Sequence, residues 1–308
     1  MTVPKVSIII PNYNHAQYLS QRLNSIFNQN YQNFEVIILD DCSIDNSKDI
    51  IGKYKSNPKV SHIIYNDTNS GSPFKQWAKG LKLAQGDYIW IAESDDWAEP
   101  AFLKNMVPIL EQDSSVSIVF CNSYNENGSH LIKTQNPFNK TKKINHNEML
   151  KKHLSWKCTI YNASSALFRR KLALTICNDY QDFSSSGDYL FWIYLAELGN
   201  VYYIHVPLNH YRIHNHNKSI EERVSGKAFL EDLKIFHYKK EKHYSTFFNR
   251  QTTVLNYLHQ INAQIHTNIH NDILYQARTL WRKEILSPLL STLIVKSGEF
   301  IWKIFNRH

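Results

Sequence analysis

The segment VSIIIPNYNHAQYLSQRLNSIFNQNYQNFEVIILDD, residues 6–41, decides the fold. It begins with an apolar, β-branched run at 6–11 and ends with a second run at 34–39, and such runs are typical of strands buried on both faces. Between them, apolar residues recur at the spacing of an amphipathic helix: Leu19, Leu23, Ile26 and Phe27. A strand, a helix and a second strand in this order predict a parallel βαβ unit.

The same alternation continues to about residue 125. We expect further strands at 60–65, in DYIWIAESDD at 87–96 and at 116–122, and helices at 73–86, with Gly86 as the C-cap, and at 100–110. A shorter helix after the second strand has Ser43 or Asp45 as its N-cap. These elements predict an α/β, doubly wound, mostly parallel and Rossmann-like sheet, whose ligands bind beyond the carboxyl ends of the strands.

Composition and charge divide the chain into two parts. A length of 308 residues with 43% hydrophobic residues suits one large domain with an extension, or two domains. We predict a domain over 1–220, with halves at 1–125 and 126–220, and a helical, basic C-terminal extension over 221–308. The extension holds 13 Lys and Arg against 8 Asp and Glu, a surplus of +5 within the total formal charge of +8.

The positive charge suits a partner that carries phosphate. Nucleic acid is an unsuitable partner, because most of the charge lies in the extension while the expected ligand cleft is acidic. The four cysteines show no CxxC spacing, so we expect buried thiols of a reducing compartment. With no apolar segment of signal-peptide or transmembrane length in the sequence, we expect a cytoplasmic protein.

Two pairs of acids follow predicted strands: Asp40 with Asp41, and Asp95 with Asp96, the second pair preceded by Glu93. One such pair alone is most simply a helix cap or a turn. Two pairs at the same edge of one sheet repel each other, and a divalent cation with oxygen ligands, Mg²⁺ or Mn²⁺, would offset that repulsion. Since no glycine-rich phosphate loop occurs, we expect the metal to hold the phosphates of a ligand.

The chain resembles the family 2 glycosyltransferases, which have the GT-A fold. The resemblance rests on P-x-Y-N at 11–14, Q-x-Y-x-x-F-E at 29–35, D-D-x-S-x-D at 40–45 and G-x-Y-I-x-x-x-x-x-D at 86–95. It covers 5–125 closely, 160–220 more loosely, and not the remainder. It implies an enzyme that uses a nucleotide-sugar donor and Mn²⁺ or Mg²⁺, and that transfers the sugar with inversion. It also implies a nucleotide-binding half at 1–125 and an acceptor-binding half at 126–220.

The resemblance implies roles for residues at the nucleotide base. Pro11 and Tyr13 would line the base pocket, Asp41 would accept the uracil N3–H, and Asp40 would support the turn or the ribose. A carboxylate that accepts this N–H favours uracil over cytosine, which points to UDP or dTDP. Lys75 could contact phosphate, although an exposed lysine on a helix is usually only solvated.

For the metal, the resemblance favours Asp96 as the direct ligand, with Asp95 on the ribose or acting through water, and Glu93 behind them. The segment YRIHNHNKS at 211–219 resembles a family segment that closes over the diphosphate. There His214 would bind the metal or phosphate, with His216 as an alternative, and Arg212 would hold the leaving group through its planar guanidinium.

The acceptor side needs a base that removes a proton from the attacking hydroxyl. Asp188 precedes an apolar helix, and the family places its base in such a segment, four residues before a tryptophan that matches Trp192. Asp188 is also a good helix N-cap, and Asp179 and Asp182 are alternatives for the base. Three further residues would bind the acceptor: Ser164, Ser165 and Trp192.

The leading hypothesis is therefore an inverting, metal-dependent glycosyltransferase that moves a sugar, such as a hexose or an N-acetylhexosamine, from a UDP-sugar to a glycan or lipid-linked acceptor. Such pathways build polysaccharide, lipopolysaccharide or capsule. A nucleotidyltransferase that makes activated sugars and a non-catalytic nucleotide-sugar-binding subunit are the alternatives. The segment 285–308 mixes apolar and basic residues, so it could contact the inner face of the membrane, pack on the catalytic domain, or form a homodimer.

Overall fold

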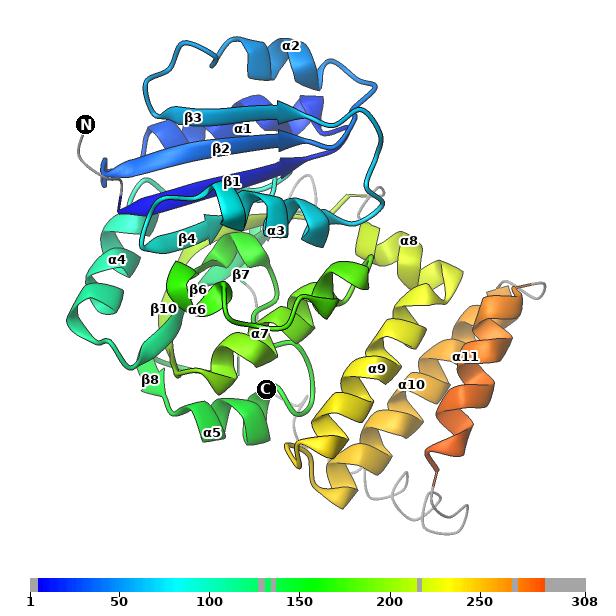
Figure 1. The fold of residues 1–308 in the computed structure, drawn as a ribbon. Helices are drawn as coiled ribbons and strands as arrows, with labels where there is room; N and C mark the ends of the chain where they lie inside the picture. Colours follow the sequence, from blue (N-terminus) through cyan, green and yellow to red (C-terminus); the bar gives the residue numbers. More distant parts are fainter. Residues whose placement is uncertain (1–4, 127–130, 134–136, 215–217, 268–270, 286–308) are drawn as a thin grey trace. The chain divides into compact units, whose positions relative to one another are not determined.

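The computed structural model describes residues 5–126, 131–133, 137–214, 218–267 and 271–285. They form two compact units, one within 1–150 and 158–215 and the other within 151–157 and 216–308. The first unit contains the sheet, and the second is helical (Figure 1).

One sheet runs through the first unit in the order β3-β2-β1-β4-β9-β6-β10-β5. The predicted parallel arrangement of the first four strands is confirmed, since β1 pairs in parallel with β2 and β4, and β2 with β3. β9 lies antiparallel between β4 and β6, and the short strands β5, β7 and β8 also pair antiparallel, while β6 and β10 pair in parallel. The α/β class with a mostly parallel sheet therefore holds, with antiparallel additions in its second half. The strands are β1 (Val6–Asn12), β2 (Phe34–Asp40), β3 (Val60–Tyr65), β4 (Tyr88–Ile91), β5 (Trp97–Ala98), β6 (Val116–Glu126), β7 (Leu131–Lys133), β8 (Lys142–Ile144), β9 (Ala166–Arg169) and β10 (Asn200–Arg212).

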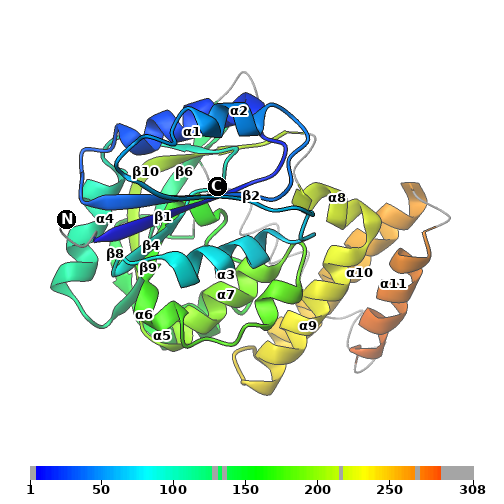
Figure 2. The same ribbon diagram turned by 45° about the horizontal axis from the view of Figure 1, so that its top comes forward.

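Helices cover both faces of this sheet, with α1 and α2 on one side and α3 and α7 on the other (Figure 2). Ile8 of β1 and Ile38 of β2 face the first side, where they pack with Leu19 and Leu23 of α1. On the second side, a Cβ added to Gly80 of α3 would lie 2.4 Å from Ile9 Cγ2, so the helix backbone lies directly against the strand. The helices are α1 (Ala16–Phe27), α2 (Ser47–Gly52), α3 (Pro73–Leu83), α4 (Phe102–Gln112), α5 (His146–Glu148), α6 (Arg170–Ala173) and α7 (Gly187–Glu197).

Some local expectations are corrected by the structure. α3 ends at Leu83, and Gly86 is not its cap but lies against β1, where a Cβ would be 2.7 Å from Ser7 N. Asn46 occupies the N-cap position of α2, and Asp45 Oδ1 accepts from Ser47 N. Of the four cysteines, only one is buried, Cys121.

Where the structure describes the second unit, it is built mainly of four helices: α8 (Lys218–Ser225), α9 (Lys227–Glu241), α10 (Phe247–Thr267) and α11 (Asp272–Lys283). Their core contains Phe229, Val254, Ile261 and Trp281, as expected for a helical extension. Most of the segment predicted to contact membranes, 286–308, lies outside the described residues. Within the part of the chain that the structure describes, no helix combines the length and apolar character needed to cross a bilayer.

Candidate functional site

The candidate site lies at the carboxyl ends of β1, β4 and β10. The two acid pairs do not form one cluster there, because β1 lies between β2, which ends at Asp40, and β4, which precedes Asp95. Of the four aspartates, only Asp95 belongs to the group of potential metal ligands found among the described residues. The expectation of one four-carboxylate metal site is therefore wrong.

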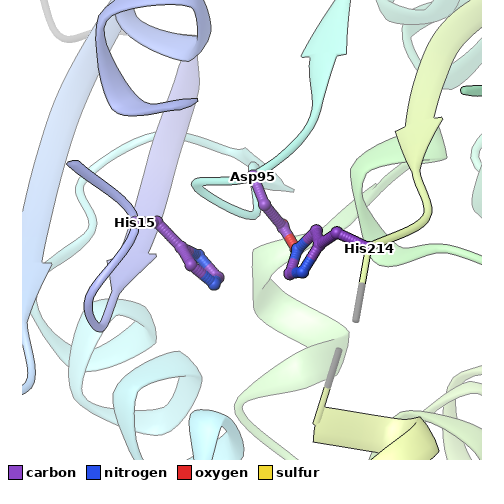
Figure 3. A group of neighbouring side chains, drawn as sticks. All are labelled: His15, Asp95 and His214. Carbon is purple, nitrogen blue, oxygen red and sulfur yellow. The ribbon is translucent and has the colours of Figure 1, made fainter. Parts of the chain in front are cut away.

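Asp95 meets two histidines from other parts of the chain (Figure 3). His15 lies in the turn between β1 and α1, and His214 follows β10. One ligand atom of each of the three residues lies within 4.8 Å of the others, and His214 Nε2 is 3.1 Å from Asp95 Oδ2. A carboxylate with two imidazoles is a donor set that fits a divalent transition-metal ion.

The electrostatics keep these groups in the forms that bind metals. Burial alone would raise the pKa of Asp95, but the hydrogen bond from His214 and the charges of His15 and His214 outweigh it and hold that pKa below 3.8. Burial lowers the pKa of His15 below 6.5, against the attraction of Asp95. Near neutral pH the site thus offers a carboxylate and a neutral imidazole.

His15 was not recognised from the sequence. It stands among other polar residues in PNYNHAQY, and neither its spacing nor its charge distinguishes it. One feature of the sequence could have identified His15 as a site residue: it lies in the first βα turn, at the edge of the sheet where ligands bind. His214 was expected to bind metal, and the structure places it beside Asp95. Its alternative, His216, lies outside the described residues.

The geometry does not support Asp96 as the direct metal ligand. Its side chain is 0% exposed, and both carboxylate oxygens accept hydrogen bonds from the protein. Oδ2 accepts from Asn162 Nδ2 at 2.8 Å and from Ser164 Oγ at 2.7 Å, and Oδ1 accepts from the backbone N–H of Arg212 at 3.1 Å. Asp96 therefore fastens the loop after β4 to the end of β10, and Asp95 is the member of the pair that reaches the histidines.

The positive charge beside Asp96 comes from the protein itself. The guanidinium of Arg22, on α1, is 0% exposed and lies 3.8 Å from Asp96 Oδ2. It donates to the carbonyl of Glu93 at 2.8 Å and to Ser164 Oγ at 2.8 Å. Burial lowers the pKa of Arg22 to about 10, partly opposed by Asp96, so the group stays charged at neutral pH.

Glu93 contributes little negative charge to this cluster. Burial and the charge of Asp95 raise the pKa of its carboxyl to about 8, and Trp77 Nε1 donates to it at 2.9 Å. Burial and the same neighbour raise the pKa of Asp96 to about 6. The acids thus have separate states, with Glu93 mostly protonated, Asp96 beside Arg22 and Asp95 facing the histidines.

Arg212 anchors the loop that carries Asp95. Its guanidinium donates to the carbonyl of Asp95, to Gln21 Oε1 at 2.7 Å and to Glu126 Oε2 at 3.2 Å. Its Cζ lies 4.6 Å from the ring centroid of Tyr18, which also stacks on His214 at 5.1 Å. These contacts give Arg212 a positioning role beside Asp95, and its expected contact with a leaving group stays a prediction.

The expected base-binding residues form a second group at the end of β2. Asp40 is 1% exposed and accepts from Asn12 Nδ2 and from the N–H of Ser43. Asp41 is 5% exposed, and its carboxylate accepts from a set of donors beyond β3: Asn66, Ser70 and Gln76. Both aspartates therefore hold the loops that would surround a base.

Three further residues expected at the donor have different surroundings. Pro11 is buried in β1, whereas the ring of Tyr13 is 45% exposed directly after that strand. Lys75 is exposed on α3, and its Nζ donates to the carbonyl of Ser70 at 2.9 Å. Tyr13 is thus accessible to a ligand, and Lys75 braces the loop next to Asp41.

On the acceptor side, the expected contacts of Trp192, Ser164 and Ser165 are wrong because all three side chains are buried. Trp192 is 0% exposed and packs in the aromatic core of α3, β9 and α7. Ser164 is 0% exposed and donates to Asp96, and Ser165, 2% exposed, donates to the carbonyl of Asn162.

Asp188 lies in the first turn of α7, half-buried, with Oδ1 accepting from the N–H of Tyr189. The segment before it is fixed to the first turn of α3, because Ser72 Oγ donates to the carbonyl of Phe183. Of the alternative bases, Asp179 accepts from the Tyr194 hydroxyl at 3.0 Å and Asp182 is exposed. Asp188 is therefore the half-buried acid at the start of α7, and its role as a base stays a prediction.

The model of glycosyl transferase family 2 matches residues 7–176, more than half of the chain. The chain belongs to glycosyl transferase family 2. The matched region includes Asp95, His15 and the two acids at the end of β2, and it ends before Asp188 and His214.

Several bacterial relatives of the family are similar over part of their length. A putative teichuronic acid biosynthesis glycosyltransferase, TuaG of Bacillus subtilis, is 32% identical over 42% of this chain and 52% of its own. A poly(ribitol-phosphate) β-N-acetylglucosaminyltransferase, TarS of Staphylococcus aureus, is 36% identical over 36% of this chain and 20% of its own. The chain thus spans about half, or less, of the length of these relatives.

Solved structures of glycosyltransferases share the GT-A fold with this chain. Residues 1–349 of S. aureus TarS, in complex with UDP-GlcNAc, superpose with a TM-score of 0.61 at 20% identity, covering 91% of this chain and 72% of the other. The mannosyltransferase PcManGT of Pyrobaculum calidifontis, with GDP-Man and Mn²⁺, gives a TM-score of 0.58 at 17% identity, covering 98% and 81%. At sequence identities of 20% and 17%, these structures show that the fold is shared and no more.

Proposed function

We propose that this protein is an inverting, metal-dependent glycosyltransferase that moves a sugar from a UDP-sugar to a hydroxyl group of a glycan or lipid-linked acceptor. The observation that carries the proposal is the convergence of Asp95 and His214 at the carboxyl edge of a GT-A sheet. This edge is where open α/β sheets bind their ligands.

UDP is the nucleotide that the base-side residues favour. Asp41 is fixed by its donors with one oxygen, Oδ2, accepting only from Ser70 among the hydrogen bonds found, and such a carboxylate can accept the N3–H of uracil. The exposed ring of Tyr13 can stack on the base. The complexes of TarS with UDP and UDP-GlcNAc support this choice, whereas PcManGT binds GDP-Man on the same fold.

We assign Asp95 and His214 as the residues that hold the divalent ion. A metal ion held by them would supply positive charge that stabilises the departing diphosphate. The Arg212 guanidinium donates to the carbonyl of Asp95, and the backbone N–H of Arg212 donates to Asp96 Oδ1. These bonds fix the backbone of Asp95 and the end of β10, two residues before His214. The Mn²⁺-bound structure of PcManGT supports divalent metal use on this fold.

Asp188 is the proposed general base. It would accept the proton of the acceptor hydroxyl while that oxygen attacks the anomeric carbon, and a single displacement inverts the configuration there. The helix N-terminus at Gly187 favours the ionised carboxylate, which is the form a base needs. Because Trp192 and the two serines are buried, the residues that orient the acceptor must come from other parts of this face.

The names of the relatives, a teichuronic acid enzyme and a poly(ribitol-phosphate) enzyme, favour an acceptor of a bacterial surface polysaccharide. A third relative, the abequosyltransferase RfbV of Salmonella typhimurium, is 37% identical over 138 residues, and its name indicates transfer of a different sugar, abequose. We also propose that the basic extension contacts the inner face of the membrane and that two copies of the chain form a homodimer.

The test is a panel of UDP-, dTDP- and GDP-sugars with and without Mn²⁺, read by thermal shift and by release of the nucleoside diphosphate. We expect a metal-dependent shift and slow diphosphate release with one UDP-sugar. A nucleotidyltransferase would instead form pyrophosphate from a nucleoside triphosphate and a sugar phosphate. A non-catalytic subunit would bind the nucleotide sugar and release nothing, and either result would refute the proposal.

A further inference from the structure

The turn that carries His15 is built to hold this residue in one place. Asn14 has a left-handed backbone, with φ of 56°, and its side chain accepts from the N–H of Ile44 at 2.9 Å. On either side of His15, the N–H of Asn14 donates to Ser43 Oγ at 2.9 Å and the N–H of Ala16 donates to Asp45 Oδ2 at 2.8 Å. The loop after β2 therefore fixes the backbone of His15 from outside its own helix.

The side chain of His15 does no capping work for α1. It occupies the N-cap position, yet it makes no side-chain hydrogen bond to the helix N–H groups. Its ring instead turns toward Asp95 and His214, with the two imidazole centroids 5.7 Å apart (Figure 3). The simple explanation of His15 as a helix cap thus fails on the geometry.

A neighbour orients the ring in the way that metal-binding histidines usually require. His15 Nδ1 lies 2.8 Å from Ser94 Oγ, and Ser94 directly precedes Asp95. When Nδ1–H donates to this hydroxyl, the lone pair is on Nε2, which is the arrangement seen for ligands with a second hydrogen-bonded nitrogen. Ser94 thereby links the orientation of His15 to the position of Asp95.

We propose that His15 is a third protein ligand of the metal held by Asp95 and His214, and that it makes the site prefer Mn²⁺ over Mg²⁺. This inference rests on the proposed function. Mg²⁺ demands near-ideal octahedral geometry and is bound through carboxylates, phosphates and waters. Mn²⁺ shares the affinity for oxygen but belongs to the transition-metal series, whose ions also bind nitrogen ligands. Two nitrogens among the three protein ligands therefore weigh against Mg²⁺.

The first measurement is pulsed electron paramagnetic resonance of Mn²⁺ bound to the full chain with UDP. Two histidine nitrogens coupled to the ion are expected in the wild type, and one in His15→Asn. A single coupled nitrogen in the wild type would overturn the inference even if every variant failed to fold. If the wild type bound no Mn²⁺ with or without UDP, the metal-dependent function itself would fall.

The second measurement is competition of Mg²⁺ for the Mn²⁺ site. Asparagine replaces a nitrogen ligand by an oxygen, so His15→Asn should weaken Mn²⁺ binding by about tenfold or more and lower the ratio of Mn²⁺ to Mg²⁺ affinity. The control is His62→Asn, on β3, which lies outside the three-residue group. An unchanged affinity ratio in folded His15→Asn would refute the inference, because a merely structural role would leave the ratio as it was.

Discussion

Replacing Arg22 by methionine should destabilise the protein through Asp96. Methionine preserves much of the volume against Trp90, whose ring centroid lies 5.6 Å from the guanidinium carbon, but it leaves the buried carboxylate of Asp96 without its cation. Removing one partner of a buried ion pair costs about 3–5 kcal/mol in the free energy of unfolding. Since both side chains are 0% exposed, we expect a loss in this range at about pH 8.

A second substitution, Asp96→Asn, tests whether the uncompensated carboxylate of Asp96 causes the loss of stability in Arg22→Met. In that background Arg22→Met should cost clearly less, because no carboxylate then remains to be left uncompensated, and a double-mutant cycle gives the coupling. The assay is urea-induced unfolding followed by circular dichroism, with EDTA present so that metal binding does not contribute. A loss of less than about 1 kcal/mol, or equal losses in both backgrounds, would refute the reasoning.

The pH dependence gives a second check on the same pair. The pKa of Asp96 is raised from 3.8 to about 6 in the folded chain, so the folded state binds this proton more tightly than the unfolded state does. The stability gained from protonating Asp96 is therefore fully present below pH 3.8 and is lost as the pH rises through about 6. Without Arg22 that pKa rises further. The destabilisation by Arg22→Met should therefore be larger at about pH 8 than at about pH 5, and a flat profile would contradict the assignment.

Three further predictions follow from the site and the core. Asp95→Asn should abolish the gain in UDP affinity on adding Mn²⁺ while the melting temperature of the metal-free protein stays close to wild type; an intact Mn²⁺ effect would exclude Asp95 as a ligand. Asp188→Asn should keep the Kd for the UDP-sugar in calorimetry and lower kcat by about 10²–10⁴-fold, the usual contribution of a general base, and near-normal turnover would point to another base. Gly80→Ala should lower the free energy of unfolding by about 1–3 kcal/mol, because the new methyl group would lie 2.4 Å from Ile9 Cγ2, and an unchanged urea midpoint would show that the helix can move away.

The sequence was most informative where local pattern and tertiary structure agree. The runs at 6–11 and 34–39 are apolar except for Ser7 and Glu35, which hydrogen-bond to each other, and they form β1 and β2, which are buried along their whole length. β9 was harder to foresee, because ALFR at 166–169 is as apolar as the parallel strands and nothing in it specifies an antiparallel place between β4 and β6.

The sequence predicted which region of the fold contains the site, but it did not predict which residue in that region has which role. Asp95 and Asp96 are chemically identical neighbours, so only the turn after β4 determines which one is buried beside Arg22 and which one faces the histidines. Trp192 was misassigned because α7 is apolar on all sides, and such a helix has no face that the sequence could mark for a ligand. Arg22 reads from the sequence as a solvated helix residue, and its burial appears only in three dimensions.

The hydroxyl of Ser43 joins two parts of the donor side. It accepts from Asn12 Nδ2 at 3.2 Å and from the N–H of Asn14 at 2.9 Å, while its own backbone N–H donates to Asp40. A substitution at this serine would therefore shift the turn next to Tyr13 and the turn that begins at Asp40 in the same event. Among homologous chains, variation at positions 12, 14, 40 and 43 should be correlated, and nucleotide preference should change only when these residues change as a group.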